Sequence, residues 1–138
     1  MIIKLTLPGA PRTKKNSQRI IEKKNKKPAV LPSKAFSKYE VKCLNYLRRC
    51  ELPKDLLPIR EPVNLCAIYY RDTTGIVDLV GLLQATNDIL VDAGILADDN
   101  SNIVAGHDGS RVMFDKQKPR TEITISLYNP SLYDTNQH

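Results

Sequence analysis

The sequence predicts an α+β fold, a small mixed β-sheet with two main helices packed on one face. Apolar and polar residues alternate in several short segments, while in two longer segments apolar residues recur at spacings of three and four. The predicted order is strand, hairpin, helix, strand, helix, two short strands and a final strand, which is typical of helices layered on a sheet. With 138 residues the chain suffices for one domain with a single core. We expect that domain over residues 1–128 and a loose tail over residues 129–138.

The first half of the chain predicts a strand, a basic hairpin and a helix. Residues 2–7 (IIKLTL) alternate in character and stop at a Pro-Gly pair. Two short apolar pieces, 20–21 and 29–31, flank the segment EKKNKK and predict a hairpin with a basic tip. From Phe36 to Cys50 the apolar residues recur at helical spacing, which predicts an amphipathic helix over 34–50 with Ser33, or the Ser37 and Glu40 pair, as its cap.

The second half predicts a central strand over 62–71, a second helix and three further strands. The second helix follows Asp78 and is closed by Gly94, because a glycine after an apolar stripe is a common helix end. NIVAG and SRVMF predict two strands around the turn HDGS, and TEITISLY predicts a clean alternating strand. If the strand after residue 101 lies beside the central strand, acidic residues on either side of the second helix can converge.

Charge is divided unequally between the two parts of the chain. Residues 1–60 hold 16 Lys or Arg and four acids, a net charge of +12, whereas residues 61–138 hold five basic residues and 11 acids, a net charge of −6. This asymmetry favours a first half that meets a polyanion such as nucleic acid and a second half that holds a cation. The alternative is that the basic hairpin is only a solvated surface.

Cysteine content and hydropathy narrow the class of protein. The three cysteines show no CxxC spacing, which argues against a disulfide framework and against a zinc site. No segment approaches the roughly 18 apolar residues of a membrane span, and the first residues lack the order of a secretory signal. We therefore expect a cytoplasmic protein that does not contact a membrane.

Acidic residues near the second helix suggest a divalent cation. Asp98 and Asp99 are adjacent in GILADDNSNIV, and two such carboxylates repel unless they point apart or share a cation. Mg²⁺ typically takes one or two carboxylates together with waters and substrate phosphates, so Asp78 with one or both of these acids would suffice. The simpler alternative is that Asp78 caps a helix and that Asp98, Asp99 and Asn100 form a turn.

The segment VDLVGLLQATNDILVDAGILADDNSNIV resembles the signature region of the RusA family of Holliday-junction resolvases. The opening LTLPGAPRTKKNSQR and the segment LPSKAFSKYE are also similar to members from phages and Gram-positive bacteria, so the resemblance runs from about residue 3 to residue 127. It implies a RusA-like dimer that nicks four-way DNA junctions symmetrically in recombination and repair. It also implies Mg²⁺ as cofactor, with Mn²⁺ as the other ion the site would accept.

The resemblance carries the first family acid onto Asp78 and the late catalytic acid onto Asp99, with Asp98 as its neighbour in the motif. These three are the predicted metal ligands. Two positions depart from the family pattern: Val80 stands in place of a second acid, and Gln84 stands in place of a catalytic lysine. Either the chain uses Asp72 and Asp98 together with a nearby basic residue, Lys14 or Lys15, or it has lost rate.

The predicted DNA contacts are the basic and polar residues of the N-terminal segment, which would meet phosphates: Lys14, Lys15, Asn16, Arg19, Lys23, Lys24, Lys26 and Lys27. The leading hypothesis is a homodimeric, Mg²⁺-dependent endonuclease in which Asp78 and Asp99 hold the ion, Asp98 and Asp72 support them, and a water activated by the ion attacks. A junction-binding protein with a weakened or inactive site is the alternative. A purely structural module explains the charge division poorly.

Overall fold

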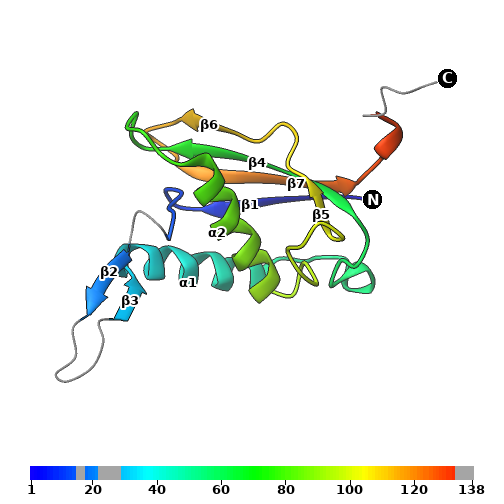
Figure 1. The fold of residues 1–138 in the computed structure, drawn as a ribbon, viewed down its shortest axis with the longest axis horizontal. Helices are drawn as coiled ribbons and strands as arrows, with labels where there is room; N and C mark the ends of the chain where they lie inside the picture. Colours follow the sequence, from blue (N-terminus) through cyan, green and yellow to red (C-terminus); the bar gives the residue numbers. More distant parts are fainter. Residues whose placement is uncertain (15–17, 22–28, 133–138) are drawn as a thin grey trace.

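The computed structural model describes residues 1–14, 18–21 and 29–132, and it confirms the predicted α+β class (Figure 1). Its main body is a mixed five-stranded sheet with two helices. The strands are β1 Ile2–Pro8, β4 Val63–Arg71, β5 Val104–Gly106, β6 Arg111–Phe114 and β7 Arg120–Leu127; β2 Gln18–Ile21 and β3 Ala29–Pro32 form a separate pair; the helices are α1 Lys34–Arg49 and α2 Leu79–Asp92, with short 3-10 turns at Lys54–Leu56 and Pro130–Leu132.

β4 lies at the centre of the sheet, as its apolar alternation predicts. β7 pairs antiparallel with β4 on one side, and β1 pairs antiparallel with the other edge of β7. On the opposite side of β4 lie β5 and β6, both parallel to it. The strand after residue 101 therefore does run beside the central strand.

β5 and β6 behave as one strand interrupted by the predicted HDGS turn. They do not pair with each other but lie along successive parts of β4, at Val63–Asn64 and at Ile68–Arg71. The side chain of Asn64 holds the interruption: its Oδ1 accepts from the Asp108 backbone N–H at 2.9 Å, and its Nδ2 donates to the Asp108 carbonyl at 3.2 Å. A Cβ at Gly106 would lie 2.9 Å from that Oδ1, so a larger residue there would displace the Asn64 side chain from its contact with Asp108.

One face of the sheet is buried along β1, β7 and β4. Cross-strand neighbours such as Leu5, Ile123 and Ala67 lie side by side on this face, each at most 5% exposed. The same core contains the inward residues of α1 and α2, which places both helices on that face. On the opposite face, side chains such as Lys4 and Thr6 of β1 are exposed.

α1 forms where the sequence predicts it, because its apolar stripe matches the helical repeat. Ser33 is the N-cap, and its Oγ accepts from the backbone N–H of Phe36 at 3.1 Å. The buried residues of α1 are Phe36, Tyr39, Cys43 and Leu47.

α2 is fastened to the central strand by a buried hydrogen bond. The Tyr69 hydroxyl lies 2.7 Å from Thr86 Oγ1, and Thr86 itself donates to the Leu82 carbonyl at 2.9 Å, so Tyr69 is the donor of the first bond. Gly94, with φ of 76°, ends the helix in the left-handed conformation that glycine adopts without strain.

The predicted hairpin and the predicted tail are only partly described. β2 and β3 pair antiparallel, which confirms the hairpin, while its basic tip lies outside the described residues. Beyond β7, Asn129 Oδ1 accepts from the Ser131 backbone at the start of a 3-10 turn, and the rest of the predicted tail lies outside the described part. Among the described residues, no helix combines the length and apolar character needed to cross a membrane.

Candidate functional site

Asp78 follows the loop that connects β4 to α2, and it is the N-cap of α2. Its Oδ1 accepts from the Val80 backbone N–H at 3.1 Å. A Cβ at Gly81 would lie 3.3 Å from Asp78 Oδ2 and 3.2 Å from Thr13 Cγ2, so the glycine allows the buried Thr13 to approach this end of the helix. Asp78 therefore does cap α2, while its role as a metal ligand stays a prediction.

A polar cluster lies farther along α2. Gln84 Nε2 donates to Asp88 Oδ1 at 3.1 Å and to Asp99 Oδ2 at 3.2 Å, one contact for each of its two N–H bonds. The second oxygen of Asp88 accepts from Lys14 Nζ at 3.1 Å. We call these four residues, Lys14, Gln84, Asp88 and Asp99, the α2 cluster.

The α2 cluster opens to solvent, which lets a ligand reach its carboxylates. Lys14, Asp88 and Asp99 line a cavity of about 300 Å³ together with Val91 and Asp92. The Lys14 and Asp88 side chains are 39% and 28% exposed, so their ion pair contributes only about 0.2–1 kcal/mol to stability. Lys14 Nζ also lies 5.7 Å from the centre of the Phe36 ring, which anchors the lysine over α1.

Asp98 shapes the turn that presents Asp99. Asp98 Oδ1 accepts from the Asp99 backbone N–H at 2.7 Å, and Oδ2 accepts from Asn100 Nδ2 at 3.1 Å. Asn100 Oδ1 in turn accepts from the backbone of Asn102 at 2.9 Å. Both oxygens of Asp98 are therefore used within the turn, which supports a positioning role for Asp98.

The structure brings Asp99 together with Gln84, Asp88 and Lys14 in the α2 cluster, of which Asp78 is not a member. Gln84 follows the N-cap by six residues, which places it about 9 Å along the helix axis from Asp78 at 1.5 Å per residue. The Gln84 side chain then reaches farther along α2, toward Asp88.

Asp72 is not a member of the α2 cluster, and most of the predicted DNA contacts fall outside the described residues. Asp72 is exposed in the loop after β4, where Arg71 Nη1 donates to the Gly75 carbonyl. Lys14 is part of the cluster, and Arg19 lies in β2, whose backbone alone is described. The remaining predicted contacts fall outside the described residues: Lys15, Asn16, Lys23, Lys24, Lys26 and Lys27.

Asp88 is the residue that sequence reasoning missed. It follows Gln84 by four positions, and residues four apart on a helix are neighbours on one face. That spacing was the available signal, and it places Asp88 on the same face of α2 as Gln84.

The oxygen donors of the α2 cluster suit a small, hard cation. Asp88 and Asp99 both reach the Gln84 amide nitrogen, and Mg²⁺ needs only one or two carboxylates when waters and substrate phosphates complete its shell. Within the described ranges, no three His, Cys, Asp or Glu side chains are grouped closely enough to hold a metal ion together. The cluster therefore fits an open site with two carboxylates and not a closed protein cage.

Comparison with known proteins adds no relative: no protein-family model matches the sequence, and no curated protein matches it.

Proposed function

We propose that the chain is a Mg²⁺-dependent endonuclease of the RusA type that cuts branched DNA, with four-way junctions as its substrate, in recombination and repair. The observation that carries the proposal is the α2 cluster. There, two carboxylates from the segment that resembles the family's signature region reach one exposed amide beside a lysine. Carboxylates that can hold a metal ion, next to a cationic side chain, are one arrangement that catalyses phosphodiester hydrolysis.

In this proposal Asp99 and Asp88 hold the ion, and Asp98 orients Asp99 through the turn. Mg²⁺, when bound, supplies a Lewis acid for the phosphate and lowers the pKa of a coordinated water. The roles of Asp78 as a further ligand and of Asp72 as a supporting acid stay predictions. Lys14 takes the part of the lysine that Gln84 replaces, because its ammonium is held within 3.1 Å of Asp88 at the open edge of the cluster.

A second candidate is a junction-binding protein whose catalytic site is weakened or inactive. Val80 is 73% exposed at the start of α2, where the family pattern has an acid. The Gln84 amide also donates to both carboxylates, which partly satisfies them in the absence of an ion. Both features favour reduced activity.

The proposal includes a homodimer, because paired symmetric nicks require two sites. The exposed outer edge of β6 supports a homodimer. β6 pairs with β4 alone among the described strands, and Val112, Met113 and Phe114 are 37%, 43% and 53% exposed. Such an apolar edge is a ready template for pairing with a second copy. Met113→Lys should therefore convert a dimer into a monomer in light scattering, whereas an unchanged dimer would exclude this edge.

Junction cleavage tests the proposed activity. A labelled four-way junction and a linear duplex of the same sequence are incubated with and without Mg²⁺, alongside Asp99→Asn and the control Asp108→Asn, which changes an exposed acid in the β5–β6 turn. Paired nicks that need Mg²⁺ and vanish only in Asp99→Asn support the enzyme. Junction-selective binding without nicks supports the second candidate, and equal binding of junction and duplex without nicks contradicts both.

A further inference from the structure

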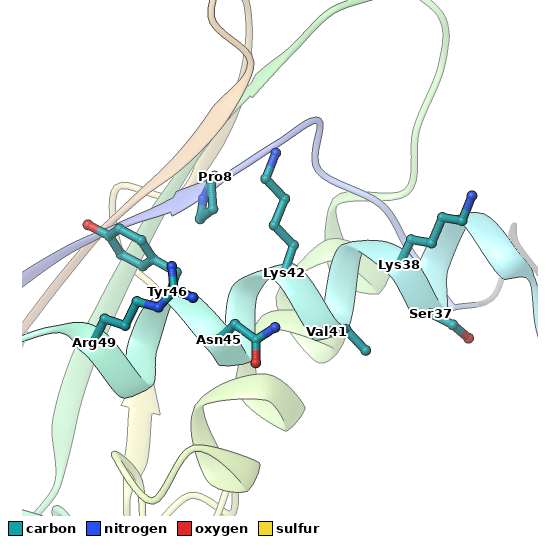
Figure 2. A pocket seen from close by; sticks show the side chains of 8 residues that line it. All are labelled: Pro8, Ser37, Lys38, Val41, Lys42, Asn45, Tyr46 and Arg49. Atoms are coloured by element: carbon teal, nitrogen blue, oxygen red, sulfur yellow. The ribbon is translucent and has the colours of Figure 1, made fainter.

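α1 carries a basic groove that lies apart from the α2 cluster. Its cations stand one to two helical turns apart along the helix, since Lys42 follows Lys38 by four residues and Arg49 follows Lys42 by seven. Figure 2 shows Lys42 and Tyr46 extending from α1 toward Pro8 at the end of β1. The groove has a volume of about 670 Å³, and we define this α1 groove by six of its lining residues: Pro8, Lys38, Val41, Lys42, Tyr46 and Arg49.

The α1 groove is positively charged, and no acid in its described lining offsets that charge. No acidic residue lines it, and Lys38, Lys42 and Arg49 make no ion pair within the described part of the chain. A neighbouring hollow, lined by Arg12 together with Lys38 and Lys42, extends the basic surface toward the end of β1. Like charges gathered at this density favour a ligand that carries several negative charges in a row.

The floor of the groove is apolar and includes one aromatic ring. Tyr46 is 38% exposed and Val41 is 55% exposed, and Pro8 closes the side formed by β1. A partly exposed aromatic ring among cations is the arrangement on which unpaired bases stack while the cations track the backbone. Bases within a duplex are already stacked, so a duplex would leave this floor unused.

We propose that the α1 groove binds a single-stranded segment of nucleic acid, with phosphates on Lys38, Lys42 and Arg49 and a base stacked on Tyr46. The inference deepens the proposed function, on which it rests for the identity of the ligand as nucleic acid. It assigns single-stranded nucleic acid to a surface separate from the carboxylates of the α2 cluster. An acidic peptide and a second copy of the chain are the competing occupants.

Binding without cleavage tests the charged part of the proposal. Fluorescence anisotropy in EDTA measures affinity for a labelled thymidine oligomer of about 15 nucleotides, starting near about 50 mM salt. The variant Lys38→Gln/Lys42→Gln/Arg49→Gln is compared with the control Lys54→Gln/Lys116→Gln/Lys118→Gln, which removes equal charge outside the groove. We expect at least about a tenfold loss in the first variant only, and a salt slope reduced by about 2 at roughly 0.7 per lost phosphate contact.

Tyr46 tests the stacking part. Tyr46→Leu should weaken oligomer binding about tenfold while Tyr46→Phe retains it, because one stacked base contributes that order of affinity. Circular dichroism establishes that both variants fold. Equal loss in the two charge variants, no effect of Tyr46→Leu, tighter binding of a polyglutamate peptide than of the oligomer, or a dimer that the groove variant dissociates would each overturn the proposal.

These outcomes separate the groove from the proposed enzyme. If the oligomer binds in the groove but Mg²⁺ supports no cleavage of any junction, the proposed function fails and the groove stands. If the natural chain nicks junctions with Mg²⁺ but the oligomer does not depend on the groove, the inference fails and the proposed function stands.

Discussion

Replacing Val80 by Asp and Gln84 by Lys in one chain tests whether these two residues weaken the site. Val80 is the second residue of α2 and is 73% exposed, so a carboxylate there stays solvated. Because a helix N-terminus carries partial positive charge, that carboxylate should add about 0.3–1 kcal/mol of stability.

The lysine at position 84 would enter between two carboxylates. Gln84 Nε2 already lies 3.1 Å from an oxygen of Asp88 and 3.2 Å from one of Asp99, so an ammonium placed there gains an exposed ion pair of about 0.2–1 kcal/mol. Lys before Asp at a spacing of four is the weaker orientation, which favours the lower part of that range. The double variant should therefore be about 0.5–1.5 kcal/mol more stable, a rise of a few degrees in Tm.

The rate of junction nicking should rise in the same variant. One preorganised charged or donor group in an active site is worth about 10²–10³ in rate, so the restored pair should raise the single-turnover rate by at least about 10². Val80→Asn/Gln84→Met is the control, because it alters both side chains without adding charge. A double variant that is less stable than the natural chain, or that nicks no faster than the control, would refute this reasoning.

Further predictions concern the frame that holds the site. Thr86→Val leaves the buried Tyr69 hydroxyl without an acceptor and should cost about 1–3 kcal/mol in urea unfolding, while Tyr69→Phe should cost only about 0.5–1.5 kcal/mol; equal costs would contradict the donor assignment. Burial raises the pKa of the Cys43 thiol to about 11, so iodoacetamide at about pH 8 should label it far more slowly in the native protein than in urea, and fast native labelling would contradict its burial. The backbone N–H of Lys118 is the main cause that lowers the pKa of Asp115 below 3.8, so its contribution to stability is complete above that pH and is lost as pH falls through the lower folded value. The loss of unfolding free energy in Asp115→Asn, measured in urea against the natural chain, should shrink as pH falls through that acid range. A loss that does not depend on pH would exclude this contribution of Asp115.

Local pattern was sufficient to predict the elements but not all of their pairing. The apolar residues from Phe36 to Leu47 and the alternating apolar residues of β4 are the residues that become buried, so both elements form where the sequence predicts them. The sequence predicts β5 and β6 on either side of the HDGS turn, but it does not predict that both pair with β4, beside which Asn64 holds the backbone of Asp108, 44 residues away. Contacts across such a separation leave no periodic signal in the sequence.

Sequence pattern likewise predicts only part of the α2 cluster. Asp98, Asp99 and Asn100 form a residue pattern typical of a turn, and the structure contains that turn. The meeting of Asp99 with Gln84 depends on the path of the chain after α2, which local pattern does not determine. Asp88 lies one helical turn from Gln84, so its place on the same face of α2 was predictable from spacing alone.

The central claim is that the carboxylates of the α2 cluster hold a divalent ion, and paramagnetic broadening by Mn²⁺ in amide NMR spectra measures this directly. We predict that signals around Asp88 and Asp99 are lost first, that Mg²⁺ restores them by displacing Mn²⁺, that the loss is absent in Asp99→Asn, and that broadening at other residues weakens with distance from these two carboxylates. Broadening that is uniform over the protein, or that persists in Asp99→Asn, would contradict the claim.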